Sequence, residues 1–163
     1  MKKPIIQLYD NFNPPKKFEH SDFDLEVLSP LHNKMDFEAW NSSIEDLKGI
    51  FGPRNNWPEE VSSLEKNLKD LNNHLKEFKE KEAFTYTILN PQKDLCIGCL
   101  YIRPTNSKQH DCRVDFWFRN SHKNLEPNFY SWLNNWLVTD WGFENIAYPG
   151  RNMEWEEYYE VNR

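Results

Sequence analysis

Apolar and polar positions follow several different periods along this chain. The run from Phe23 to Leu28 alternates apolar and acidic residues, which is typical of a strand with one solvated face. From Val61 to Phe78, apolar residues recur at steps of three and four with Glu and Lys between them, which predicts an amphipathic helix. A similar spacing from Phe37 to Leu47 predicts a helix that Asn41-Ser42-Ser43 either interrupts or leaves whole.

The period changes to two in the second half of the chain. Residues 83–89 and 95–102 are predicted strands joined by a turn at 90–94, and residues 112–118 form another strand. A helix is predicted from Pro127 to Trp141, followed by a short strand at 145–148. This order predicts an α/β (α+β) protein in which helices pack on a mixed sheet.

The length of 163 residues fits one domain. Residues 1–20 contain three prolines and little periodic hydrophobicity, so we expect an N-terminal arm followed by a single domain at 21–163. The 15% of aromatic residues provides large side chains for the core. The acidic and aromatic residues after Met153 are expected to form a tail.

Charge and cysteine content narrow the class of partner. Lys and Arg total 20 against 26 for Asp and Glu, and a net charge of −6 is opposite in sign to that of a phosphate-backbone binder. No apolar run is long enough to span a membrane or to act as a secretory signal, so we expect a cytoplasmic protein without nucleic acid or membrane partners. Three cysteines do not suggest a disulfide framework.

Known chemical motifs are scarce. Cys96-Ile97-Gly98-Cys99 matches CxxC, but in a regular strand a separation of three sends the two thiols to opposite faces, so we expect no metal site. The five histidines show no ligand spacing, and the glycine-rich loops of nucleotide hydrolases and the nucleophile elbow of serine hydrolases are absent.

One strand motif and the order of elements resemble a known superfamily. The strand Phe84–Leu89 followed by Gly98-Cys99-Leu100-Tyr101-Ile102-Arg103-Pro104 is similar to the central hairpin of the GNAT (Gcn5-related N-acetyltransferase) superfamily, whose fourth strand often begins with Gly and ends at Pro. Residues 114–119 and 146–151 would then be the fifth and sixth strands. The resemblance covers 23–151 and implies a mostly antiparallel central sheet flanked by helices.

The resemblance also implies a place for acetyl-coenzyme A. In the superfamily this cofactor lies where two strands splay apart, with its pyrophosphate on a [QR]xxGx[GA] loop at the next helix N-terminus. We therefore expect strands 95–102 and 112–118 to diverge toward Arg103 and Arg119, and continuous pairing there would count against a cofactor in that place. The loop residues expected to bind the cofactor together with Arg103 are Arg119, Asn120, Ser121, His122, Lys123 and Asn124.

This loop departs from the superfamily motif. His122 and Asn124 replace both glycines, which hinders close backbone approach to a phosphate, and Pro127 removes a donor. Side-chain charges on Arg119, His122 and Lys123 compensate in part. An ordinary strand-to-helix connection is the alternative reading of the loop.

Candidate residues for acyl transfer follow from the same resemblance. Asp115 is the only carboxylate on these strands and is the candidate general base, or else a plain exposed or ion-paired strand residue. Tyr101 is a candidate to position an acyl group or a water, or else a core residue. Trp57 and Trp117 are placed on the acceptor side.

Two functions remain open at this point. The first is an N-acyltransferase that passes an acetyl group from acetyl-coenzyme A to an amine of a small molecule or peptide. The second is a non-catalytic GNAT-fold protein, which binds another ligand or regulates a partner and has lost coenzyme A chemistry. In either case the protein is a candidate homodimer.

Overall fold

A six-stranded sheet forms the centre of the protein, for which a computed structural model describes residues 4–163. The strands are β1 Lys17–Glu19, β2 Asp24–Val27, β3 Phe84–Leu89, β4 Cys96–Arg103, β5 Cys112–Phe118 and β6 Ile146–Ala147. They lie in chain order, and every neighbouring pair is antiparallel except β5 and β6, which are parallel. The expected mixed, mostly antiparallel sheet is confirmed, and β1 is a strand that was not predicted.

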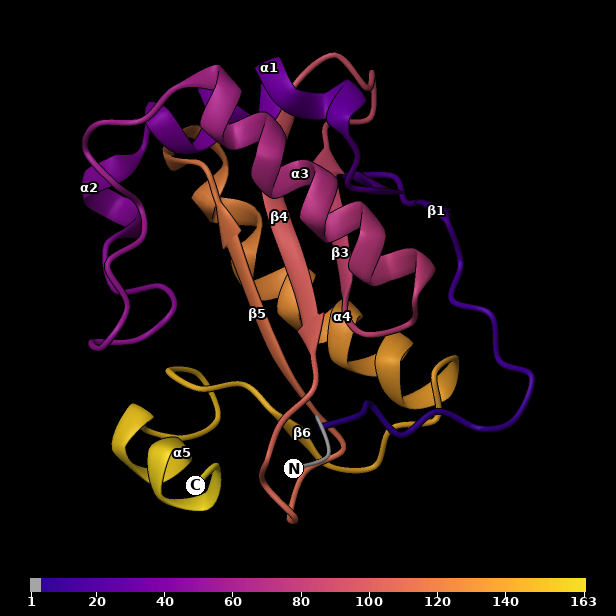
Figure 1. Ribbon diagram of the computed structural model, residues 1–163. Helices are drawn as coiled ribbons and strands as arrows, with labels where there is room; N and C mark the ends of the chain where they lie inside the picture. The colour runs from indigo at the N-terminus through magenta and orange to yellow at the C-terminus, as the bar shows by residue number, and fades with distance from the viewer. Residues whose placement is uncertain (1–3) are drawn as a thin grey trace.

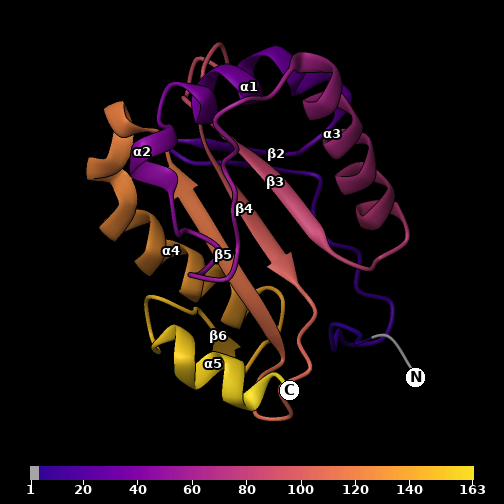
Figure 2. The ribbon, with the colours of Figure 1, turned by 60° about the vertical axis from the view of Figure 1, so that its left-hand side comes forward.

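Helices cover both faces of this sheet. They are α1 Asn33–Asn41, α2 Ile44–Leu47, α3 Leu64–Lys79, α4 Glu126–Thr139 and α5 Trp155–Val161, with 3₁₀ helices η1 Pro30–His32 and η2 Asn120–Leu125. Helices α1 and α3 lie on one face and α4 on the other (Figure 1, Figure 2). Of the two alternatives for residues 37–47, the interrupted helix is the one observed, and the tail after Met153 contains α5. No helix within residues 4–163 is long and apolar enough to cross a membrane.

The alternation of side chains along β5 separates two apolar layers. Val114, Phe116 and Phe118 pack with Phe129 and Leu133 of α4 in the larger core cluster. Trp117 belongs to the second cluster, beneath α1 and α3, together with Tyr101. Successive side chains of a strand point to opposite faces, so this one strand contributes to both layers.

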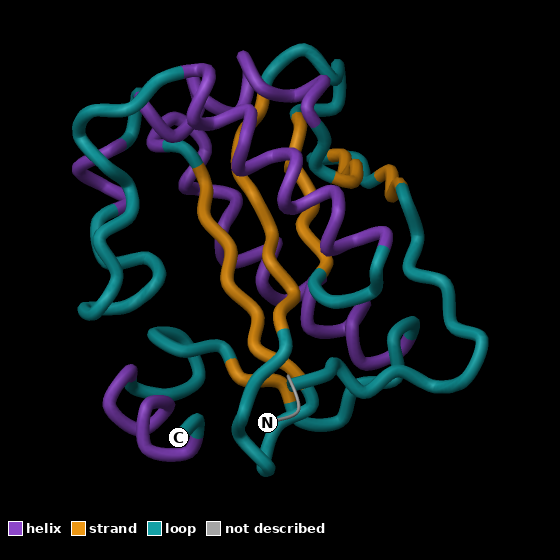
Figure 3. Tube along the Cα trace, viewed as in Figure 1, coloured by secondary structure: helices purple, strands orange, loops and turns teal. Residues whose placement is uncertain are grey.

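The N-terminal segment packs against the domain. Ile6 is buried in the larger cluster, the Tyr9 hydroxyl donates to the Asp140 carbonyl at 2.9 Å, and the Phe12 ring lies 5.3 Å from that of Trp141. The segment is drawn as a long coil that leads into β1 (Figure 3). The expected arm is thus an extended stretch that contributes side chains to the core, and residues 1–3 lie outside the described part.

The expected geometry of the CxxC motif is wrong. Cys96 and Cys99 both belong to the cluster beneath α1 and α3, whereas Ile97 and Leu100 point to the α4 face. The register against β3 shifts at this point, because Leu89 pairs with Cys96 while Ile88 pairs with Gly98. Such a β-bulge adds one residue and reverses the alternation. Within residues 4–163, no group of three or more His, Cys, Asp or Glu side chains could hold a metal ion.

Gly98 allows the close approach of two strands at this bulge. A Cβ atom at Gly98 would overlap the Trp117 carbonyl oxygen, although the backbone there is not left-handed. We expect Gly98→Ala to lower the free energy of unfolding by about 2 kcal/mol through overpacking, measured by urea denaturation. Gly49→Ala is the control, because Gly49 has open space but a φ of +83°, and it should cost only about 1 kcal/mol. An equal loss in both variants would contradict a steric role for Gly98.

Candidate active site

The expected opening between strands 95–102 and 112–118 does not exist. Strands β4 and β5 pair without a break from Gly98 opposite Phe118 to Arg103 opposite Arg113. The prediction was wrong because a short loop joins these strands and makes them antiparallel, so Arg103 and Arg119 lie at opposite ends. Two strands that splay apart at their carboxyl ends must be parallel, and a parallel pair needs a longer crossover.

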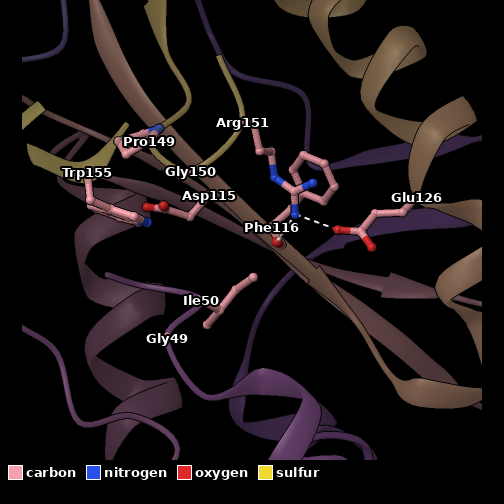
Figure 4. Close-up of a pocket in the computed structure, with 9 residues that line it drawn as sticks. All are labelled: Gly49, Ile50, Asp115, Phe116, Glu126, Pro149, Gly150, Arg151 and Trp155. Atoms are coloured by element: carbon pink, nitrogen blue, oxygen red, sulfur yellow. Dashed lines mark hydrogen bonds and ion pairs between the residues drawn. The ribbon is translucent and has the colours of Figure 1, made fainter. Parts of the chain in front are cut away.

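The crossover through α4 creates such a pair one strand later. Strand β5 pairs with β6 only at Cys112 opposite Ile146 and Arg113 opposite Ala147, and the rest of β5 continues without a partner in β6. A cleft of about 260 Å³ opens beside this part of β5. Its lining residues come from β5, the start of α4, the segment after β6, α5 and the loop after α2: Asp115, Phe116, Glu126, Pro149, Gly150, Arg151, Trp155, Gly49 and Ile50 (Figure 4).

Asp115 is the buried carboxylate of this cleft. It is only 4% exposed, and its Oδ2 accepts a hydrogen bond of 2.8 Å from the Nε–H of Arg113. Burial raises the pKa of Asp115, while the charges of Arg113 and Arg103 act in the opposite direction. The residue is therefore ion-paired but not exposed, and a buried carboxylate with a raised pKa is better matched to accepting a proton than an exposed one.

Arg151 spans the cleft. Its Nη2 donates to the Phe116 carbonyl at 3.0 Å and to Oε1 of Glu126 at 2.6 Å, and its guanidinium carbon lies 3.7 Å from the centre of the Phe116 ring. Figure 4 shows the side chain extended from the segment after β6 across Phe116 toward α4. Arg151 and Glu126 could not be predicted as site residues from the sequence, because only the return of the chain after β6 brings them together.

The outer walls of the cleft come from two segments that are distant in sequence. The Arg54 guanidinium, in the loop after α2, lies 3.9 Å from the centre of the Tyr159 ring in α5. Arg113 stacks over Trp155 at 5.0 Å. Contacts between arginine and aromatic rings thus hold both α5 and this loop close to Asp115.

The segment expected to bind phosphate is the short 3₁₀ helix η2 and not an open loop. Its first backbone donor, Asn120 N, bonds to Ser43 Oγ at 3.0 Å, and His122 N bonds to the Arg119 carbonyl. The Ser121 hydroxyl and His122 Nδ1 lie 2.8 Å apart, and Lys123 and Asn124 are exposed. Burial and the nearby Arg119 lower the pKa of His122, which reduces its positive charge at neutral pH.

Arg119 holds η2 to α1. Its two Nη atoms donate to the carboxylate of Glu38 at 2.7 and 2.6 Å, and Nη1 also donates to the buried Cys96 carbonyl at 3.1 Å. A hollow of about 350 Å³ lies beside it, lined by Ser42, Ser43, Arg119, Asn120 and Ser121. The Arg119 guanidinium already donates to Glu38 and to the Cys96 carbonyl, so a phosphate in this hollow would compete with these groups for its N–H donors.

The contacts of Arg119 predict an effect on stability. Arg119→Met should lower the free energy of unfolding by about 2 kcal/mol, or the Tm by about 4–8 °C, because the Cys96 carbonyl loses a charged donor. Lys123→Met removes a charge from the neighbouring η2 helix without losing an ion pair and should leave the Tm unchanged. Differential scanning calorimetry checks both variants, and equal melting temperatures would contradict a structural role for Arg119.

The remaining candidate residues lie on the α1 and α3 side of the sheet, away from the cleft lining. The Trp117 Nε1–H donates to the Tyr101 hydroxyl at 3.0 Å, and the Trp57 ring lies 5.8 Å from that of Trp117. The Arg103 guanidinium rests 4.8 Å from the Phe51 ring centre and 4.7 Å from that of Tyr101. The structure therefore brings Tyr101, Trp57 and Trp117 together, but only Asp115 of the expected catalytic pair reaches the cleft.

Solved structures that are similar to this chain include several acetyltransferases. The ribosomal-protein-S5-alanine acetyltransferase of Vibrio fischeri matches with a TM-score of 0.63 and 13% identity, over 88% of this chain and 80% of that chain. The spermidine N-acetyltransferase of Vibrio cholerae, in complex with CoA and spermine, matches with a TM-score of 0.56 and 15% identity, over 78% and 70%. The microcin C7 self-immunity acetyltransferase, in complex with acetyl-CoA and AMP, matches with a TM-score of 0.58 and 12% identity, over 76% and 64%.

These likenesses concern the fold. No protein-family model and no curated protein sequence matches the chain. At identities of 12–15% the structural matches show that the chain has the fold of the GNAT acetyltransferases, which confirms the expected fold class. Fold and cleft together define the chain as a GNAT-fold protein with a buried carboxylate where its two parallel strands part.

Proposed function

We propose that this protein is an N-acyltransferase that passes an acetyl group from acetyl-coenzyme A to a primary amine of a small molecule or peptide. The observation that carries the proposal is the cleft beside the unpaired part of β5, with Asp115 at its inner end. Continuous pairing of β4 and β5 removes the place first expected for the cofactor, so the proposal rests on the β5–β6 cleft alone.

The cleft suits the acyl-pantetheine end of the cofactor. An unpaired strand accepts extended, amide-containing groups as an added strand would pair with it. The Phe116 carbonyl faces the cleft and is the hydrogen-bond acceptor that Arg151 now uses. Acetyl-coenzyme A, when bound, would supply an activated thioester acyl group close to Asp115.

The polar hollow at Ser42, Ser43, Arg119, Asn120 and Ser121 suits the phosphates. It lies at the carboxyl end of β5, and the four residue steps from Asp115 to Arg119 span about 13 Å of extended chain. Some backbone N–H groups of η2 already donate to other protein groups, so side chains must supply much of the phosphate binding. We propose that Ser121, His122, Lys123 and Asn124 bind the phosphates together with Arg119 and Asn120. Arg103 lies on the opposite end of the sheet and has no place in this arrangement.

Asp115 would take the proton from the acceptor amine. Its burial keeps water away and raises its pKa, so that the carboxylate is a stronger base than an exposed aspartate. Arg113 keeps the carboxylate oriented through the bond to Oδ2, which leaves Oδ1 for the amine. Attack of the neutral amine on the thioester carbonyl carbon would then form the amide and break the carbon–sulfur bond, and coenzyme A would leave as the thiol with the remaining proton lost by the amine nitrogen.

A direct assay tests this proposal. Purified protein is incubated with acetyl-coenzyme A and a panel of small amines and peptides, and acetylated products are detected by mass spectrometry. Release of free coenzyme A can be followed with a thiol reagent, because the protein's own Cys96, Cys99 and Cys112 are buried. Product formation that depends on protein and amine supports the proposal. Calorimetric binding of acetyl-coenzyme A is measured in parallel.

A specific observation favours the second candidate function. Arg151 and Glu126 already occupy the cleft, whose 260 Å³ is below the roughly 300–1,000 Å³ of common ligand pockets. A GNAT-fold protein that no longer binds coenzyme A would retain such a closed cleft. Absence of any thermal stabilisation by acetyl-coenzyme A would establish this alternative, since ligand at 100 times its Kd adds about 2.7 kcal/mol.

The side chain of Arg151 predicts a distinct effect on cofactor affinity. Arg151→Ala should tighten the binding of acetyl-coenzyme A about 5-fold, because it frees the Phe116 carbonyl and removes about 1 kcal/mol of competing interaction. Isothermal titration calorimetry measures the change, with Arg163→Ala as the control for loss of one arginine from an exposed ion pair. Weaker binding would mean that Arg151 contacts the cofactor itself.

We also infer that the protein works in a reducing compartment such as the cytoplasm, with an amine as partner and a homodimer as a candidate assembly. The three free, buried thiols support the first inference.

A further inference from the structure

A second, smaller cavity lies on the α1 and α3 side of the sheet. Its volume is about 40 Å³, and its walls include Asp36 and Trp40 of α1, Trp57, Asp70 and His74 of α3, and Tyr101 of β4. Asp70 is exposed, and Trp57 and His74 are half-buried, so these three residues form the mouth while Asp36 lies at the inner end. The cleft beside Asp115 shares none of these residues.

Asp36 is a buried carboxylate without a lysine or arginine partner in the described part of the chain. It is 5% exposed, and its Oδ2 accepts one hydrogen bond, of 3.0 Å, from Asn67 Nδ2. Burial raises the pKa of Asp36 to about 6, against the smaller opposing effects of Asn67 and His74, which leaves the group mostly ionised at neutral pH. Buried charges are usually paired, so this carboxylate needs a positive group.

The other walls of the cavity are aromatic. The rings of Trp40 and Trp57 lie 5.7 Å apart, and the ring of Tyr101 lies 5.8 Å from that of His74. The Trp40 Nε1–H is directed to Asn67 Oδ1, at 3.1 Å, which fixes the indole beside the carboxylate. Aromatic faces attract cations, and a carboxylate among indole rings is a typical environment for an ammonium group.

The size of the cavity limits the ligand. A water needs at least about 10–15 Å³ of such volume, so 40 Å³ accommodates one ammonium head with its first carbon atoms and no larger cation. A metal ion is a poorer fit, because no cluster of three or more His, Cys, Asp or Glu ligands occurs in the described chain. The rest of the ligand would pass the mouth between Trp57, Asp70 and His74.

We propose that this cavity is a binding site for the primary ammonium group of an aliphatic amine, with Asp36 as the counter-ion and Trp40, Trp57 and Tyr101 as its aromatic walls. The inference does not rest on acyl transfer at the other cleft, because it uses no residue that lines that cleft. The exposed carboxylate of Asp70 at the mouth adds attraction for the incoming cation.

Titration with n-butylamine, followed by ¹H–¹⁵N NMR of the tryptophan indoles, tests the site. The Trp40 indole signal should shift and saturate with a Kd on the order of 1 mM, and n-butanol, of similar shape but without charge, should bind at least 10-fold more weakly. Trp40→Phe assigns the signal. Equal shifts with n-butanol would overturn the proposal, because the site would then recognise the alkyl chain only.

Two variants of the full chain complete the test. Asp36→Asn keeps the shape of the side chain and its acceptor for Asn67, and it should weaken n-butylamine binding at least 10-fold. Asp70→Asn, the matched control at the exposed mouth, should weaken it less than 3-fold. Unchanged affinity in Asp36→Asn would overturn the role of the counter-ion, and absence of acetylation activity in the unmodified protein would leave this result unaffected.

Discussion

Asp115→Asn is expected to lower kcat/KM for acetyl transfer by about 10²–10³-fold at neutral pH, while leaving the affinity for acetyl-coenzyme A within about 2-fold. The amide cannot accept the proton of the amine, and a positioned general base contributes typically 10²–10⁴-fold. The substitution keeps the size of the side chain and leaves an amide oxygen as acceptor for Arg113. Steady-state assays with the acceptor amine and calorimetry with the cofactor measure the two quantities.

The pH profile adds a readout that a purely structural role would not change. Because burial raises the pKa of Asp115 above the ordinary value of 3.8, activity of the unmodified protein should fall as the pH drops through that raised pKa. Asp115→Asn should lose this acidic limb together with the rate. Asp46→Asn, at an exposed carboxylate of α2, is the control. If the Asp115→Asn variant retained more than half of the activity, Asp115 would be excluded as the base.

The second large effect concerns stability and Asp36. Asp36→Asn should raise the free energy of unfolding by up to about 3 kcal/mol at pH 7–8, because the ionised carboxylate is buried without a lysine or arginine partner in the described chain. Its pKa of about 6 in the folded protein exceeds the value of 3.8 for the free side chain. Protonation therefore stabilises the fold fully below pH 3.8, and this contribution is lost as the pH rises through about 6.

Urea denaturation between pH 4 and pH 8 measures this dependence. The advantage of the Asn variant should be largest at pH 7–8 and small near pH 4, where Asp36 is protonated in the folded chain and partly protonated in the unfolded one. Asp70→Asn, at an exposed carboxylate of α3, should change stability by less than about 0.5 kcal/mol. A gain that did not vary with pH would argue against ionised Asp36. If Asp36 lowers the free energy of unfolding but binds a cation, it is an example of the trade-off between stability and function.

The sequence predicted the layered fold well, because the fold depends on local periodicity. The long helix α3 and the hairpin of β3 and β4 follow from the spacing of apolar residues and from breakers, whereas the division between α1 and α2 was left open by the sequence. The three-residue strand β1 was missed, because Lys17-Phe18-Glu19 is too short to show a period. The bulge at Ile97 was missed too, because it depends on the register against β3.

The candidate site was predictable only in part. Asp115 was named as a candidate because it is the only carboxylate on its strands, and its catalytic role is still a prediction. The strand pair that opens was misplaced, since the hydrophobic pattern does not show whether neighbours run parallel. Arg151, Glu126 and Asp36 carry no sequence motif, and they become informative only through long-range contacts. The general rule that a site lies where parallel strands end beside a crossover helix would have directed attention to β5 and β6.

The short outer strands of the sheet protect the protein against aggregation. Exposed strand edges pair readily with other chains, and proteins protect them with brevity, charge and proline. At one edge, β1 has only three residues, two of them charged, and follows Pro14 and Pro15; at the other, β6 has two residues and is followed by Pro149. The unpaired part of β5 is the remaining edge, and Arg151 covers its Phe116 carbonyl. The ion pair that narrows the cleft therefore also keeps that edge from intermolecular strand pairing.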